Sequence, residues 1–208
     1  QRPFVGTLTM ELTTDADDEV ASWIAQGTPP ICFGFGSMPV AESPAETVKM
    51  IGAACAKLGE RALICSGWSD FSDVPQLDHV KVVGVVNYTK VFPACRAVVH
   101  HGGSGTTAAG LRAGIPSLIL WTAGDQPMWG SRVKQLKVGA SRRFSATTPE
   151  TLVEDLRKIL APEYLSRARE LATRMSKPAD SAGRAVDLLE EFARSGRCVP
   201  DVPAERSR

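Results

Sequence analysis

Short apolar runs that alternate with amphipathic segments of helical length are the feature that most restricts the fold of this chain. Runs of strand length begin at residues 31, 61, 80, 97, 116 and 139. Strands separated by helices pair in parallel through right-handed crossovers, and helices then cover both faces of the sheet. The sequence therefore predicts an α/β fold with a Rossmann-like open parallel sheet and helices on both faces.

The alternation and the helix signals also predict how the chain is divided. Residues 1–30 are mostly polar, with one short amphipathic helix over 20–27, and are predicted to be an interdomain linker. Residues 31–196 are predicted to form the main domain, and three helices end it after residue 147. The last segment, 197–208, has no periodicity and is predicted to be a disordered tail.

Charge and cysteine content restrict the partners of the protein. With 208 residues, a formal net charge of +1 and a pI near 7.8, the chain has no overall field to attract nucleic acid, so we expect no such partner. Five cysteines without a CxxC pair indicate reduced thiols and a cytoplasmic protein. No apolar run reaches 18 residues and no signal-peptide pattern is present, while the missing initiator Met suggests a fragment.

The stretch HHGGSGTT, residues 100–107, is the most informative motif. A helix that begins near Ser104 has unpaired N–H groups and the positive end of its dipole at this point, which favours a phosphate. Glycines allow the main chain to approach an anion closely, and the hydroxyls of Ser104, Thr106 and Thr107 are further donors. The lysine of a P-loop is absent. The alternative is that the glycines only permit a tight turn.

The two histidines are expected to differ in role. Neighbouring residues on a strand point to opposite faces, so His100 and His101 do not share one ligand. We expect His101, next to the glycines, to donate to a phosphate, and His100 to be a buried structural imidazole. No zinc site is expected, because His79 is the one other histidine and no further ligand spacing is present.

A second glycine-rich strand end, GFGSMP at residues 34–39, is close to a dinucleotide fingerprint. Pro39 replaces its third glycine, and the next strand end has no acidic residue to bind a ribose. An NAD-dependent oxidoreductase is therefore an alternative. Ser37 is interpreted either as a hydroxyl on the phosphate side of the site or as a simple cap.

The stretches 34–38, 84–133 and 139–160 together resemble the C-terminal half of GT-B glycosyltransferases. The resemblance extends from about residue 30 to 195 and is closest to sterol glucosyltransferases and to bacterial enzymes that glycosylate macrolides, glycopeptides and glycolipids. It implies that residues 31–196 are the nucleotide-sugar donor-binding domain, with UDP-glucose or another UDP- or dTDP-sugar as donor and no cofactor. It also implies a separate N-terminal domain for the acceptor.

The resemblance assigns roles to single residues. His101 corresponds to the histidine that contacts the diphosphate, and Gly103, Ser104, Gly105 and Thr106 correspond to the loop whose amides hold it. Asp125 and Gln126 in GDQP (124–127) correspond to the pair that binds sugar hydroxyls, which suits a carboxylate and an amide. Asp125 is also interpretable as the N-cap of the next helix.

The base is expected at the segment GVVNY, residues 84–88. Val86 lies where the backbone of the family recognises the base, whereas plant relatives place a stacking tryptophan at about the position of Val85. Trp68 is a candidate to line the base pocket in its stead, or it packs on the surface. Met128 and Trp129 are expected to pack.

The implied reaction is an inverting, metal-independent transfer of a sugar, glucose being expected, to a hydroxyl of a lipid, sterol or natural product. His101 would stabilise the leaving group. The general base belongs to the N-terminal domain, so this chain is expected to be inactive alone, and a lipid acceptor would bring it into peripheral contact with a membrane. The alternatives are a UDP-sugar epimerase-like enzyme and a non-catalytic nucleotide-binding module.

Overall fold

The computed structural model describes residues 3–9, 13–34, 36, 43–67 and 74–196. They fall into two compact units: an α/β unit over the residues up to 175, starting at 13, and a second unit made of 3–9 and 176–196. The candidate site lies in the α/β unit.

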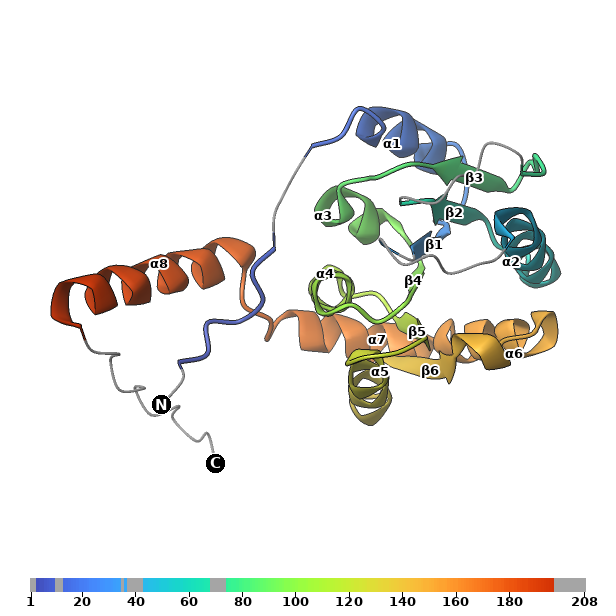
Figure 1. Ribbon diagram of the computed structural model, residues 1–208. Helices are drawn as coiled ribbons and strands as arrows, with labels where there is room; N and C mark the ends of the chain where they lie inside the picture. The colour runs from blue at the N-terminus through green and yellow to red at the C-terminus, as the bar shows by residue number, and fades with distance from the viewer. Residues whose placement is uncertain (1–2, 10–12, 35, 37–42, 68–73, 197–208) are drawn as a thin grey trace. The chain divides into compact units, whose positions relative to one another are not determined.

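The α/β unit is built on a six-stranded sheet (Figure 1). Its strands are β1 (Ile31–Gly34), β2 (Ala62–Cys65), β3 (Val80–Val83), β4 (Ala97–His100), β5 (Ser117–Trp121) and β6 (Gly139–Arg143). They lie in the order β3-β2-β1-β4-β5-β6, and every pairing is parallel. The predicted open parallel sheet is confirmed.

Helices cover both faces of the sheet, as predicted (Figure 1). The helices of this unit are α1 (Asp17–Ala25), α2 (Pro44–Leu58), α3 (Tyr88–Val91), α4 (Ser104–Ala113), α5 (Gln126–Gln135), α6 (Pro149–Ile159) and α7 (Pro162–Ala172), with short 3-10 turns η1 (Phe92–Ala94) and η2 (Phe144–Ala146). α2 and α6 pack on one face, and α1, α3, α4, α5 and α7 contribute to the clusters on the other.

The core explains why the strands read as continuous apolar runs. Phe33 and Val99 point to the α2 and α6 face, whereas Cys32 and Val98 point to the opposite face, and all four are fully buried. A strand buried on both faces needs apolar residues at every position, so the period of two disappears from the sequence.

Capping residues fix the ends of α2 and the start of α6. The Ser43 side chain accepts the Glu46 N–H at 3.3 Å, and Thr148 forms a capping box with Thr151. Gly59 ends α2 in the left-handed conformation. Local signals therefore determine where these helices start and stop.

Helix α1, predicted within the linker, packs on the sheet. Val20 and Ile24 are buried in the cluster that contains Cys32 and Val98. The division into 1–30 and 31–196 stays a prediction, to which this packing adds that α1 belongs with the α/β unit. The tail at 197–208 lies outside the described residues.

The second unit contains helix α8 (Pro178–Ser195) and residues 3–9. The hydroxyls of Ser176 and Ser181 are 3.0 Å apart, and a β-carbon on Gly6 would lie within 2.8 Å of both oxygens. Val186, Leu189 and Phe192 of α8 are at least half exposed. No helix in the described part of the chain is both long and apolar enough to span a bilayer.

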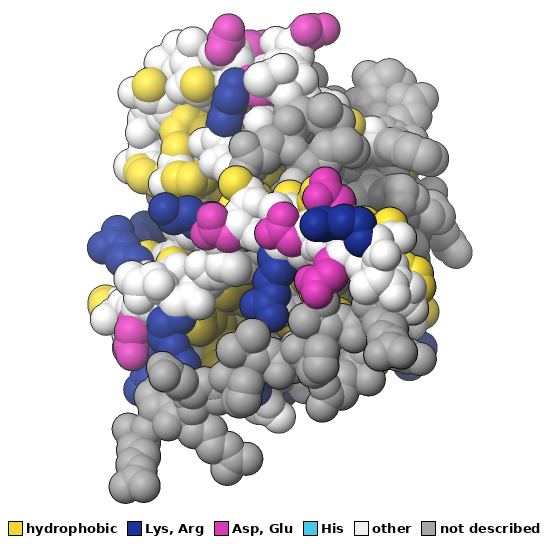
Figure 2. All heavy atoms as spheres, turned by 90° about the vertical axis from the view of Figure 1, so that its left-hand side faces the viewer, with side chains coloured by type: hydrophobic (Ala, Val, Ile, Leu, Met, Phe, Trp, Pro, Cys, Tyr) yellow, Lys and Arg dark blue, Asp and Glu magenta, His cyan; other side chains and the backbone are white. Residues whose placement is uncertain are grey.

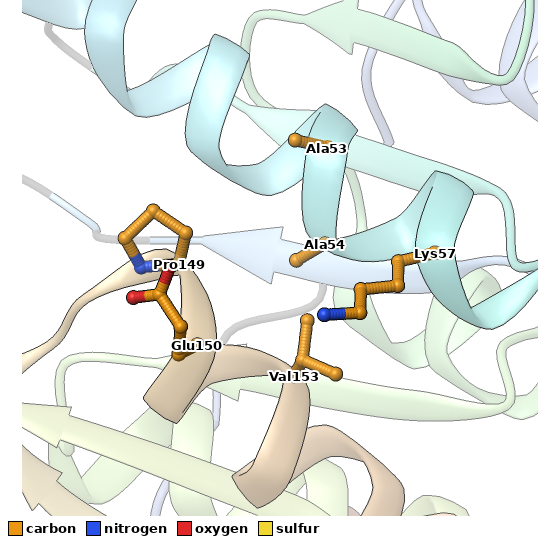
Figure 3. A pocket seen from close by; sticks show the side chains of 6 residues that line it. All are labelled: Ala53, Ala54, Lys57, Pro149, Glu150 and Val153. Atoms are coloured by element: carbon orange, nitrogen blue, oxygen red, sulfur yellow. The ribbon is translucent and has the colours of Figure 1, made fainter.

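Hollows occur on the helix layers. One, of about 90 Å³, lies between α2 and α6 and is lined by Ala53, Ala54, Lys57, Pro149, Glu150 and Val153 (Figure 3). Another, of about 330 Å³, follows α5. Neither is lined by the residues of the HHGGSGTT motif. On the face that Figure 2 shows, basic and acidic side chains are interspersed, as expected for a net charge of +1.

A buried carboxylate joins α1 to the rest of the unit. Asp17 is 5% exposed, and its Oδ1 accepts the Asn87 N–H at 2.9 Å and the Thr14 hydroxyl at 2.7 Å. The Asn87 N–H is the largest cause that lowers the pKa of Asp17 to about 2, and Thr14 and Lys90 act in the same direction. These contacts stabilise the ionised form in the folded state.

We predict that this carboxylate makes folding sensitive to acid. Because its folded pKa lies below the unfolded value, the stabilisation is complete above about pH 4 and is lost as the pH falls through about 2. Asp17→Asn should remove roughly 1–2 kcal/mol at pH 5 and nothing at pH 1.5. Urea unfolding of both proteins at these pH values measures the difference, and an equal loss at both would contradict the prediction.

Candidate functional site

The candidate site lies where the strand order reverses. β2 and β3 follow on one side of β1, whereas β4, β5 and β6 follow on the other, so the connections from β1 and β4 leave in opposite directions. Gly34 pairs with Cys65 on one side and with His100 on the other, which places the ends of these strands level. His101 comes directly after this row.

The N-terminus of α4 lies at this edge, and among the described residues no side chain caps it. Gly103 is its N-cap in extended conformation. Thr107 is the first residue whose N–H reaches a carbonyl of the turn, that of Gly103 at 2.9 Å. The N–H groups of Ser104, Gly105 and Thr106 precede it and have no partner within the helix, so they are available to an anion.

The Thr107 hydroxyl does not take the role expected of it. It donates to the Gly103 carbonyl at 2.8 Å, and the residue is buried. Ser104 is exposed and Thr106 half-buried, so their hydroxyls remain the candidates. The sequence pattern of hydroxyls alone did not distinguish a donor to a ligand from one that binds its own helix turn.

The imidazole of His101 is held between two glycines. A β-carbon on Gly36 would lie 2.9 Å from its Cε1, and one on Gly103 would lie 2.7 Å from its Nε2. Gly36 has a φ of +66°, and a β-carbon on Gly67 would lie 2.3 Å from the Gly36 carbonyl oxygen. The turns after β1 and β2 therefore contact each other through backbone, and the turn after β4 meets Gly36 through the imidazole, for which only glycine leaves room.

The environment of His101 favours the neutral ring. Burial lowers its pKa, while the backbone of Gly34 and the negative charge of Asp125 act in the opposite direction. Its Nδ1 is enclosed and makes no hydrogen bond of good geometry within the described residues, although the Gly34 backbone is near enough to favour the charged form. A half-buried imidazole of this kind has one N–H to donate to an anion.

His100 has the structural role that was predicted for it. It is completely buried, and its Nδ1 accepts the Gly102 N–H at 3.1 Å. Burial is the main cause that lowers its pKa to about 3, and the neighbouring His101 adds to it. The neutral ring thus fixes Gly102, which has a φ of +99°, and sets the course of the chain into Gly103.

Gln126 lies against this turn, but its oxygen is already used. A β-carbon on Gly102 would lie 3.1 Å from that of Gln126, so the two loops touch. Gln126 Oε1 accepts from the Thr122 N–H at 2.8 Å, the Thr122 hydroxyl at 3.0 Å and the Ala123 N–H at 3.2 Å. The side chain can therefore donate to a ligand through its NH₂ group but has little capacity to accept.

Asp125 occupies the N-cap position of α5 without capping the helix. Its Oδ2 instead accepts the indole N–H of Trp129 at 2.9 Å, and the residue is exposed. Trp129 therefore orients the carboxylate as well as packing against the core. Met128, expected to pack, is 59% exposed. The spacing of four residues between Asp125 and Trp129 on one helix was the signal for this contact.

The loop between β3 and α3 reaches the site through Tyr88. Val86 is buried in the core, whereas Val85 is 57% exposed, and the role of the Val86 main chain toward a base stays a prediction. A β-carbon on Gly34 would lie 2.9 Å from the Tyr88 hydroxyl, and the Tyr88 ring stacks on Phe92. Sequence analysis did not identify Tyr88, since no local pattern indicates this contact.

Two predicted site residues, Ser37 and Trp68, lie outside the described residues. Among the residues that the structure describes, no group of three or more His, Cys, Asp or Glu side chains is placed to hold a metal ion. The structure thus brings His101, the start of α4, Asp125 and Gln126 together, and it places the 84–87 loop at the same edge of the sheet.

Comparisons with known proteins show the family and the fold of the chain. The profile of the family described as "Erythromycin biosynthesis protein CIII-like, C-terminal domain" matches residues 43–188. An uncharacterised glycosyltransferase of Mycobacterium tuberculosis is 68% identical over 197 residues, which cover 95% of this chain and 47% of the relative. A sterol 3-beta-glucosyltransferase of Arabidopsis thaliana is 34% identical over 194 residues, 91% of this chain and 31% of that protein.

A solved structure, that of the glycosyltransferase VinC in complex with dTDP, has the same fold. It superposes with a TM-score of 0.66 at 22% identity over 88% of this chain and 45% of that chain. The chain spans about half the length of the mycobacterial relative. The chain belongs to the erythromycin biosynthesis protein CIII-like C-terminal domain family, and it has the fold of the corresponding part of a solved glycosyltransferase.

Proposed function

We propose that this domain binds the donor of a sugar transfer, a UDP- or dTDP-sugar, with the diphosphate at the N-terminus of α4. The observation that carries the proposal is the set of uncapped amides at Ser104–Thr106 beside an imidazole that two glycines hold in place. Both groups favour an anion, and they lie at the switch point where such sheets bind nucleotides.

The strand order indicates on which side of the α4 turn the sugar and the nucleoside of the donor lie. Asp125 and Gln126 follow β5, on one side of the α4 turn, so the sugar lies there. The nucleoside then extends to the other side, over the ends of β1, β2 and β3, where the main chain of Val86 faces it. Glucose suits the two side chains, since one carboxylate oxygen of Asp125 is open to accept and the Gln126 NH₂ can donate.

Negative charge develops on the diphosphate as the glycosidic bond breaks. Fixed amides and the His101 N–H stabilise this charge more in the transition state than in the ground state, and therefore accelerate the transfer. They take the place of a divalent cation, so the reaction needs neither a metal nor a cofactor. Inversion follows from attack by the acceptor hydroxyl on the face opposite the leaving group.

The acceptor and the general base belong to the half that relatives carry and this chain does not span. A lipid, sterol or natural-product hydroxyl is the proposed acceptor, and the proposed partner is the protein's own N-terminal domain. Val186, Leu189 and Phe192 of α8 offer that domain an apolar face. Within the described loops at this edge (84–87, 101–103, 122–125), Asp125 is the one carboxylate, whereas an epimerase would need a pair.

His101→Ala should weaken the binding of UDP or dTDP about tenfold or more, because a charge-assisted hydrogen bond is lost. His101→Gln keeps an N–H donor and should recover part of the affinity. Because a diphosphate favours the charged ring, the advantage of histidine over glutamine should grow from pH 8 to pH 6. Calorimetric titration measures all three proteins, with NAD and UDP-glucose as further ligands, and equal affinities would exclude the role of His101.

Gly36→Ala should weaken nucleotide binding more than Gly59→Ala. Both glycines have left-handed backbones, with φ of +66° and +69°, so both substitutions introduce similar strain. Only Gly36 faces His101, whereas nothing lies within 4 Å of a β-carbon at Gly59. Titration with UDP after matching the proteins by thermal unfolding separates the two effects, and a parallel loss in both variants would reject the steric argument.

This chain alone should release no UDP from UDP-glucose, whereas the protein extended by the N-terminal half of its relatives should do so. The physical reason is that the resemblance assigns the general base for the acceptor to the N-terminal half. A coupled assay for UDP, with a sterol or a macrolide as acceptor, measures the release. Release of UDP by the isolated chain would contradict the proposal that the general base belongs to the N-terminal half.

A further inference from the structure

The β3–α3 loop, residues 84–87, is the part of the site that the sheet supports least. β3 is an edge strand that pairs with β2 alone among the described strands, and the loop leaves it at Val83. Gly84 and Val85 are exposed, so they do not pack. Val86 is buried in the cluster that also contains Val20 and Ile24, so α1 helps to fix the loop.

Asp17 at the start of α1 holds the far end of this loop. Its carboxylate accepts the Asn87 N–H at 2.9 Å, from a residue 70 positions along the chain, and Lys90 Nζ lies 3.5 Å from Oδ2. Thr14 also donates two hydrogen bonds to the carboxylate, from its hydroxyl at 2.7 Å and from its N–H at 3.1 Å. A second contact, between Glu19 and Lys81, joins α1 to β3 itself.

Asn87, the residue that Asp17 binds, is followed directly by Tyr88 at the end of β1. The Asn87 side chain accepts the Thr89 N–H at 3.0 Å and thereby starts α3. The next residue, Tyr88, stacks on Phe92 with ring centroids 4.5 Å apart and brings its hydroxyl to Gly34 at the end of β1. Asp17 thus positions Tyr88 at the end of β1 through its contact with Asn87.

We propose that Asp17 is a positioning residue that fixes the β3–α3 loop and through it sets the affinity for the nucleoside part of the donor. The inference rests on the proposed function, because it assumes that the nucleoside lies over the ends of β1, β2 and β3. The diphosphate groups, His101 and the α4 amides, are on β4 and α4, so they do not depend on this anchor.

The test compares UDP with inorganic pyrophosphate in calorimetric titrations at pH 7, and dTDP replaces UDP if wild type binds it more tightly. Asp17→Asn keeps the shape of the side chain but turns an NH₂ group toward Thr14 N–H and Lys90. It should weaken UDP about tenfold and pyrophosphate less than twofold. Asp18→Asn, one position further along α1 and exposed, is the matched control and should change neither.

An equal loss for both ligands, or no loss for either, would overturn the role of Asp17 and leave the proposed function standing. Wild-type protein that binds neither ligand would overturn the proposed function and this inference with it. If Asp17→Asn does not fold, Thr14→Val decides, because it removes one donor and keeps the carboxylate. It should weaken UDP about threefold with pyrophosphate unchanged, and an equal effect on both would exclude the inference.

Discussion

Parallel pairing requires every strand of this sheet to end at the same edge, and the site depends on that constraint. Cys65, Gly34, His100 and Ile119 form one level row across four strands. The turns that follow them must share a small volume, since helices on both faces leave the chain nowhere else to turn. Steric crowding at this edge explains the glycines better than flexibility does. A β-carbon on Gly36, Gly67 or Gly103 would overlap with backbone or with the imidazole of His101.

The adjacent histidines His100 and His101 differ in role mainly because they differ in burial. His100, with no exposed surface, stays neutral and acts as an acceptor that shapes the Gly102 turn. His101 keeps partial exposure and faces Asp125, whose charge opposes the effect of burial on its pKa. One residue type thus serves as a structural acceptor and as a candidate donor to an anion, and the alternation of the strand separates the two roles.

Sequence patterns predicted the fold and the course of the chain well, because those depend on local signals. The start of α4 at Ser104, the caps at Ser43 and Thr148, and the parallel sheet all follow from short-range preferences and periodicity. The motif also predicted that a helix starts at a strand end, and α4 does begin at Ser104 after β4; the roles of its residues toward an anion stay predictions.

The sequence could not predict contacts that depend on a hydrogen-bond partner distant along the chain or on the rotamer of one side chain. The Gln126 oxygen is taken by its own loop, and the Thr107 hydroxyl by its own helix turn, so residue type alone overestimated the groups free for a ligand. Asp17 stands in an acidic run at a helix start, where acidic residues are common for reasons of the helix dipole, so its burial against Asn87 had no signal.

Under the proposed function, the backbone contact between Gly67 and Gly36 restricts how the preference for a donor can change. Because the turns after β1 and β2 meet without intervening side chains, neither can be lengthened or shifted without displacing the other. Variation at the proposed base site is thus directed to the β3–α3 connection, where Val85 is 57% exposed and a bulkier or aromatic residue meets no such obstacle. Engineering for an alternative nucleotide should begin at that position.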